Sequence, residues 1–352
     1  MLSRLKSYFR ERKEDVGGST GSSIGSSLGK ILVLLLVVYL LVTIVLGIIW
    51  SDEPDTFSVR EHTRTLANEM QREPVVGFAT ASTMMRIGET LLDKPGGYIS
   101  NDLFPPGIWM DNMPSWEYGV LVQMRDLSRA MRQDISRSQS QSSEDRDLTV
   151  VEPQFNFDSG SWALPSTEGE YRRGISALRS YLDRLSRPEQ PDAQFFARAD
   201  NLDSWLADLQ TRLGSLSRTL GESVGKPSVQ DAMTQTDNAD PLAESIDGEE
   251  VKTPWTLRDN VFYEARGASW ALLHIFKAIE VDFRKVLNDK NALTSVRQII
   301  IELEGTQGSM WSPMILNGSG FGVLANHSLT MAAYLSRANA SIIDLRELLS
   351  RG

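Results

Sequence analysis

The feature that most constrains this chain is an uninterrupted apolar run from Ile31 to Ile49. The run has 19 residues and no charged side chain, and as a helix with a 1.5 Å rise per residue it is about 28 Å long. That length matches the hydrocarbon core of a bilayer, and the helices of soluble proteins are rarely apolar on every side. The run therefore predicts a transmembrane helix over residues 31–50.

The residues on the two sides of this run differ in charge. Residues 1–30 contain six Lys or Arg against three Asp or Glu, a net charge of +3. Because basic flanks stay in the cytoplasm, this bias places the N-terminus inside and the residues after Trp50 outside. A cleavable signal peptide is the alternative, but its apolar core is usually about 7 to 15 residues long and a small-x-small site follows it. Ser-Asp-Glu-Pro follows Trp50, so we expect an uncleaved anchor.

Residues 1–30 are expected to form a cytoplasmic basic segment and a Gly/Ser linker. Leu2, Leu5 and Phe9 recur at helical spacing among basic residues, which suits a helix lying on the anionic inner leaflet. A plain topology signal without fixed structure is the alternative. The run GGSTGSSIGSSLG that follows is typical of a flexible linker, although its glycines recur every four residues, as in closely packed membrane helices.

Composition narrows the functions open to the remainder of the chain. The roughly 300 residues after the anchor are enough for a sizeable core, and 41% apolar and 23% charged residues are ordinary for a folded protein. The chain has no cysteine, which excludes disulfides, a thiolate nucleophile and cysteine-based metal sites. The whole chain carries −10, so the residues after position 30 carry −13. Such an acidic domain repels phosphate backbones, and we expect no nucleic acid as a partner.

Helical periodicity dominates the chain after Trp50. Apolar residues recur every three or four positions, which predicts amphipathic helices over 116–135, 171–185, 202–220, 268–286, 293–303 and 323–349, with weaker ones at 59–72 and 76–93. The only strand-like sequence pattern runs from Val150 to Phe157, where we expect at most a short β-hairpin. The predicted fold class is all-α: one N-terminal transmembrane helix followed by a multi-helix periplasmic bundle.

Two polar stretches, 136–147 and 226–250, interrupt the helical pattern. The second is rich in acidic residues, has almost nothing to bury, and is expected to be an exposed loop. It divides the outer part into a first helical lobe, 51–225, and a second helical lobe, 251–352.

The two lobes share a sequence pattern at an offset of 148 residues. Asp111-Asn112 aligns with Asp259-Asn260, and Gly119 aligns with Gly267. Each Asp-Asn pair precedes a long predicted helix. Amphipathic helices often agree by chance, so a duplication giving two lobes with a pseudo-two-fold relation and a chance match are both open.

Three longer runs carry a resemblance to a known family. They are LLDKPGGYISNDLFPPGIWMDNMPSWEYGVLVQMRDLSRAMRQDISRSQSQS (91–142), WTLRDNVFYEARGASWALLHIFKAIEVDF (255–283) and SPMILNGSGFGVLANHSLTMAAYLSRANASIIDLREL (312–348). Over nearly its whole length the chain resembles an uncharacterised proteobacterial family of membrane-anchored proteins, defined only as a domain of unknown function. The resemblance implies a Gram-negative inner membrane with the domain in the periplasm. It transfers no catalytic or binding residues.

Histidines and metal-binding patterns offer little support for an enzyme. None of His62, His274 and His327 lies in a nucleophile elbow or another catalytic signature. His274 lies between apolar neighbours on the longest predicted helix, so we expect a hydrogen-bonded core histidine. Neither an H-E-x-x-H nor an EF-hand pattern occurs, and we expect no metal and no cofactor.

Four acidic residues cluster near two predicted helix starts: Asp111, Glu117, Asp259 and Glu264. A carboxylate-dependent hydrolase of envelope polymers would use one or two such acids with a shifted pKa. Attraction to the positive end of the helix dipole explains the same positions. We take the paired residues Asp111, Asn112, Asp259 and Asn260 as a candidate site.

A glycine-dense turn precedes the last predicted helix and contains Asn317, Gly318, Ser319, Gly320 and Gly322. Backbone N–H groups at a helix N-terminus bind anions, so this turn is a candidate anion site. An ordinary interhelical turn is the alternative. No strand precedes the turn and no lysine follows it, which excludes a dinucleotide fingerprint and a P-loop.

Aromatic residues are interleaved with prolines between positions 98 and 118: Tyr98, Phe104, Trp109, Trp116 and Tyr118. Such a cluster is typical of a surface that faces a partner or a membrane. Packing of a long loop onto the core is the alternative.

These patterns favour a non-enzymatic protein of the inner membrane that binds or organises another cell-envelope component, with an envelope protein as its partner. A lipid or small-ligand binding protein is the first alternative, using a cavity between the lobes. A carboxylate-dependent envelope hydrolase is the second.

Overall fold

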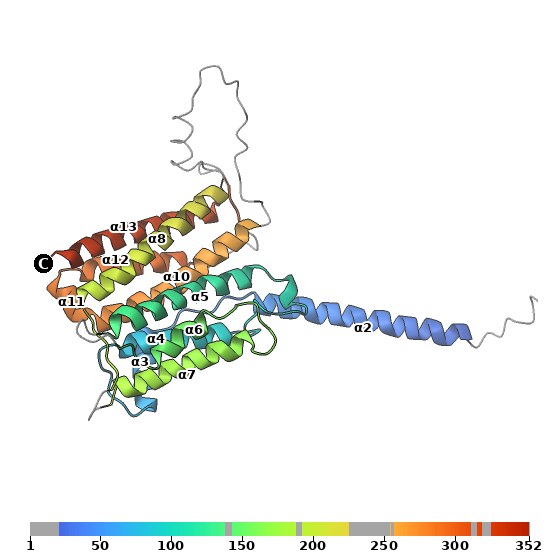
Figure 1. The fold of residues 1–352 in the computed structure, drawn as a ribbon. Coiled ribbons are helices and arrows are strands. Elements are labelled where there is room, and N and C mark those ends of the chain that lie inside the picture. Colours follow the sequence, from blue (N-terminus) through green and yellow to red (C-terminus); the bar gives the residue numbers. More distant parts are fainter. Residues whose placement is uncertain are drawn as a thin grey trace, which may run out of the picture. The chain divides into compact units, whose positions relative to one another are not determined.

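The computed structural model describes residues 21–137, 143–187, 192–224, 254, 257–310, 315–318 and 325–351. The chain forms two compact units, Met1–Ile49 and Trp50–Gly352 (Figure 1). The predicted acidic loop, 226–250, and the basic segment before residue 21 lie outside the described residues.

The described residues of the first unit, from Gly21 to Ile49, lie in one long helix, α2 (Gly21–Trp50). Its part from Gly29 to Trp50 is long and apolar enough to cross a membrane. The linker prediction is wrong from Gly21 onward, because these serine-rich residues continue the helix. The apolar helix supplies a nucleus, and extending an existing helix backward avoids the unfavourable nucleation step.

The second unit is built from helices, as predicted. Those described are α3 (Val59–Glu69), α4 (Phe78–Asp93), α5 (Asn112–Ala130), α6 (Leu148–Phe155), α7 (Thr167–Leu185), α8 (Ala199–Ser223), α10 (Arg258–Asp282), α11 (Arg284–Asp289), α12 (Leu293–Thr306) and α13 (His327–Ser350). A 3-10 turn, η1 (Gly107–Trp109), precedes α5, and a π-helical turn, η2 (Met131–Ile135), follows it. The all-α prediction is confirmed.

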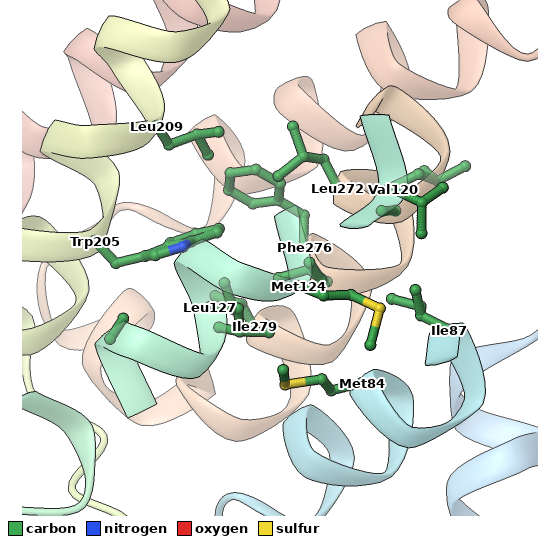
Figure 2. Close-up of a cluster of buried hydrophobic side chains, with 14 of the residues drawn as sticks. Met84, Ile87, Val120, Met124, Leu127, Trp205, Leu209, Leu272, Phe276 and Ile279 are labelled. Carbon is green, nitrogen blue, oxygen red and sulfur yellow. The ribbon is translucent and has the colours of Figure 1, made fainter. Parts of the chain in front are cut away.

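Helices α5 and α10 pack against each other at the centre of this unit (Figure 1). Helices α3, α4, α6 and α7 lie on one side of the pair, and α8, α12 and α13 lie on the other. Figure 2 shows where side chains from α4, α5, α8 and α10 meet: Met84, Ile87, Val120, Met124, Leu127, Trp205, Leu209, Leu272, Phe276 and Ile279. The core therefore runs through both predicted lobes.

The α5–α10 crossing depends on one glycine in each helix. A Cβ atom on Gly119 would lie 2.1 Å from the carbonyl oxygen of Glu264, and one on Gly267 would lie 2.0 Å from that of Trp116. Only glycine permits so close an approach of two helix backbones. Because the four residues occupy equivalent positions at the 148-residue offset, the crossing is reciprocal.

Other helix contacts repeat in the same order. In the first half of the domain, α4 and α6 both pack on α7. In the second half, α8 and α12 both pack on α13 in the corresponding way. This pattern favours the duplication. It also assigns α8 to the second copy, whereas the predicted boundary placed its residues in the first lobe. The duplication and the lobe boundaries stay predictions.

Three local predictions are wrong. The strand-like segment is helix α6, because Leu148, Val151 and Phe155 share one buried face. The predicted helix 116–135 ends its α-helical part at Ala130 and continues as η2. The predicted helix 268–286 breaks at Phe283, between α10 and α11.

The break at Phe283 coincides with a contact between helices. Asp282, the last residue of α10, accepts hydrogen bonds from the backbone N and the Oγ1 of Thr80, both at 2.7 Å. Its carboxylate thereby caps the first turn of α4, whose own N-cap residue, Gly77, offers no side chain.

Candidate functional site

A pocket of about 530 Å³ opens beside the starts of α5 and α10. We call it the helix-start pocket. Its polar lining includes Asp102, Asp111, Tyr118, Asn260 and Glu264. Three of these residues, Asp111, Asn260 and Tyr118, were predicted as site residues. The parallel α5–α10 pair therefore brings together side chains that lie about 150 residues apart in the sequence.

The charged residues that line the pocket are all acidic: Asp102, Asp111 and Glu264. None of them forms an ion pair with another described residue. Burial raises the pKa of Asp102, and the negative charges of Glu117 and Glu168 raise it further. Burial also raises the pKa of Glu264, which Arg212 partly opposes. The pocket thus holds carboxyl groups that a bound cation would stabilise in their charged form.

The two predicted asparagines lie at equivalent helix starts. The side-chain Oδ1 atoms of Asn112 and Asn260 are both buried, and neither accepts a hydrogen bond from a described residue. Next to Asn260, burial and the charge of Asp111 raise the pKa of Asp259. Buried acceptors of this kind usually have a donor. The two helix starts therefore share a buried amide oxygen beneath the surface that is unpaired within the described residues.

Glu117 positions the loop that forms one wall of the pocket. Its buried carboxylate pairs with the buried Lys94 ammonium and accepts the backbone N–H groups of Ile99 and Ser100, each at 2.8 Å. Ser100 Oγ also donates to it. Glu117 was one of four acids considered for catalysis. Its hydrogen bonds instead hold residues 94–100 against α5.

The predicted aromatic surface is only partly exposed. Phe104 is 77% exposed, Trp109 61% and Tyr118 46%. The prediction is wrong for Tyr98 and Trp116, which are buried. The ring centroids of Trp116 and Trp270 lie 5.2 Å apart between α5 and α10, and those of Tyr98 and Tyr171 lie 5.7 Å apart.

Only Asn317 and Gly318 of the predicted anion turn fall within the described residues, and neither lines this pocket. Ser319, Gly320 and Gly322 lie outside the described residues. Asn317 forms an isolated bridge with Asn326. Asn326 caps α13 by accepting the backbone N–H of Leu329 at 2.8 Å. One donor that an anion would use is therefore already paired, and anion binding stays a prediction.

His274 is a hydrogen-bonded core histidine, as predicted. Its Nδ1 lies 2.7 Å from the Trp270 carbonyl oxygen, and its Nε2 accepts the backbone N–H of Phe57 at 3.0 Å. Burial lowers the pKa of His274 to about 4. No group of three or more His, Asp or Glu side chains suited to a metal ion occurs in the described part of the chain.

Sequence reasoning missed a second exposed loop. Trp162 is 61% exposed and Leu164 fully exposed, in a stretch that belongs to no motif. The only available signal was a tryptophan and a leucine within an otherwise polar connection between predicted helices. Asn101 ties this loop to the pocket wall, because its Nδ2 donates to the Ser161 carbonyl oxygen at 3.0 Å.

Comparisons with known proteins give one family and no further relatives. No curated protein and no solved structure matches the chain significantly. The model of a bacterial protein family matches residues 24–352, which include the apolar helix and the whole second unit. The chain therefore belongs to a family of uncharacterised proteins conserved in bacteria, DUF2333.

Proposed function

We propose that this protein is a single-pass inner-membrane protein whose helical domain, in the periplasm, binds another envelope protein at the helix-start pocket. The apolar α2 segment supports the anchor, and the basic residues before it support a cytoplasmic N-terminus. The observation that supports the binding site is the pocket lining, whose described residues include three acidic side chains and no Lys or Arg.

The lining determines the chemistry of the partner. Asp102, Asp111 and Glu264 favour a positive charge in the partner. Exposed Tyr118 at the pocket provides apolar contact area beside these charges. A segment of an envelope protein that carries Lys or Arg next to apolar residues meets all of these requirements.

Photocrosslinking from residue 118 in living cells tests this proposal. A photoreactive amino acid replaces the exposed Tyr118 in the full chain, and the crosslinked proteins are identified by mass spectrometry. We expect one reproducible envelope protein with a basic segment, and we expect Asp111→Lys to reduce its crosslink about tenfold, since like charges repel at an interface. Asp344→Lys is the matched control, because Asp344 is an exposed acid on α13 outside the pocket. Equal crosslinking in both charge variants would contradict the proposal.

A lipid or small-ligand carrier is a second candidate, favoured by a separate pocket of about 530 Å³ between α10, α12 and α13. Its lining is mainly apolar and includes Phe262, Met331 and Tyr334, with Arg266 and His327 as polar groups. A preformed pocket of this kind suits an apolar ligand. Native mass spectrometry of the protein purified in gentle detergent would show a bound ligand, and a ligand-free mass in repeated preparations would exclude this candidate.

A further inference from the structure

Six exposed apolar side chains lie on the two loops joined by Asn101. We call them the apolar patch: Leu103, Phe104, Ile108, Trp109, Trp162 and Leu164. Isolated apolar residues are common on protein surfaces, but six large ones on two adjacent loops are not. Tryptophan and phenylalanine are also the side chains that lie at the interface between lipid and water.

The loops that carry the apolar patch are held in place. Asn101 Nδ2 donates to the Ser161 carbonyl oxygen of the second loop and to Glu168 of α7, at 3.0 and 3.1 Å. Buried Glu117 fixes the backbone of Ile99 and Ser100, where the first loop begins. The apolar side chains are therefore presented from a supported backbone, which lowers the entropy cost of binding a surface.

Trp50, the first residue of the second unit, contacts the chain shortly before the first patch loop. The ring of Trp50, the last residue of α2, lies so close to Gly96 that a Cβ atom there would be 2.7 Å from it. Gly96 precedes the first patch loop by a few residues. The next residues of the chain are also tied to the domain, because Glu53 pairs with the buried Arg266 at 2.5 Å. The residues that follow the apolar helix are therefore held against the domain, and one of these contacts is with the segment that leads into the first patch loop.

The charges around the apolar patch show which force could drive its binding to a membrane. Residues 99–111 and 156–166 contain no Lys or Arg, but they include Asp102, Asp111 and Asp158. Attraction to anionic headgroups therefore cannot contribute, and burial of apolar surface is the available driving force. From this placement we infer that the apolar patch inserts into the interfacial layer of the same membrane that holds α2. The inference rests on the anchor in the proposed function.

The test uses full-length protein in phosphatidylcholine nanodiscs. Because the chain has no cysteine, an environment-sensitive fluorophore can be placed on Trp109→Cys, Trp162→Cys or Ile343→Cys. Ile343 is the matched control, an exposed apolar residue on α13. With nitroxide lipids labelled near the headgroup, we expect the probes at positions 109 and 162 to be quenched at least about twofold more than the probe at 343. Because the patch loops carry acidic and no basic residues, adding anionic lipid should not increase this difference.

A fourth probe, on Val38→Cys in the apolar run, distinguishes a failure of the membrane anchor from a failure of the inference about the apolar patch. If the probe at 38 is quenched by mid-chain nitroxides while 109 and 162 behave like 343, the anchor stands and the inference is overturned. If the probe at 38 is not quenched, the anchor fails and the inference fails with it. Quenching at 109 and 162 only when anionic lipid is present would also overturn insertion driven by apolar burial.

Discussion

Gly119 of α5 and Gly267 of α10 occupy equivalent places at the crossing of the two central helices. Each lies against a backbone carbonyl oxygen of the opposite helix, that of Glu264 or Trp116. Since the atoms in the way are backbone atoms, a side chain at either position forces the helices apart.

Gly119→Ala and Gly267→Ala should therefore each destabilise the domain by about 1 to 3 kcal/mol or more. Thermal unfolding followed by circular dichroism measures this. Gly214→Ala is the control, because the new Cβ on α8 meets only Asn339 Nδ2 at an ordinary 3.7 Å. It should be neutral or stabilising by up to about 1 kcal/mol, as alanine favours helix. Similar behaviour of all three variants would refute the close crossing.

Acidification should weaken the packing around His274. Burial lowers the pKa of His274 to about 4, whereas in the unfolded chain it is about 6.5, so the unfolded state binds the proton more readily between these values. The stability from neutral His274 is fully present above pH 6.5 and is lost as pH falls toward 4, by up to about 3 kcal/mol. Protonation also removes the acceptor for the Phe57 N–H group.

Asp282 opposes this trend. Burial raises its pKa to about 6, so the folded state binds that proton more tightly and gains stability as pH falls from 6 toward 4. The His274 contribution is therefore measured as a difference between wild type and His274→Gln in unfolding experiments at pH 7 and pH 4.5. The stability advantage of wild type over the variant should shrink on acidification. A constant difference would contradict a neutral, buried His274.

Replacing Lys94 should destabilise the hydrogen-bond network that holds the pocket wall. Lys94→Met leaves the fully buried Glu117 without its cation, which typically costs about 3 to 5 kcal/mol. Limited proteolysis should then cut within residues 95–111 before the rest of the domain. Arg172→Met is the control, since Arg172 pairs with Asp93 in solvent and such pairs contribute at most about 1 kcal/mol. Comparable losses in the two variants would argue against the buried network.

Helices could be predicted from the sequence wherever one apolar face repeats over several turns. Leu202 to Leu220 and Leu293 to Leu303 are examples, and both lie in helices of the structure. The strand-like pattern at α6 was a wrong prediction because the helix is only eight residues long, and Phe155 and Phe157 alternate as they would in a strand. Periodicity cannot distinguish such short apolar segments.

Asp111, Asn260 and Tyr118, which line the helix-start pocket, were already candidate site residues in the sequence, although the pocket itself was not predicted. Asp111 and Asn260 stood out because they precede matching helices, and the parallel packing of α5 and α10 brings these starts together. The burial of Glu117 and the link from Asn101 to Ser161 depend on contacts distant in the chain. Neither has a local signature, so the pocket wall and the loop of Trp162 were beyond sequence reasoning.

The proposed anchor and its orientation have the most direct test. Because the chain has no cysteine, Asp344→Cys and Ser7→Cys can each be labelled with a membrane-impermeant maleimide in cells whose outer membrane has been permeabilised. We predict labelling at position 344 but not at position 7, with the full-length chain remaining in the membrane after alkaline washing. Labelling at position 7 alone, or a soluble product cleaved near Trp50, would contradict an uncleaved anchor that holds this domain outside the cytoplasm.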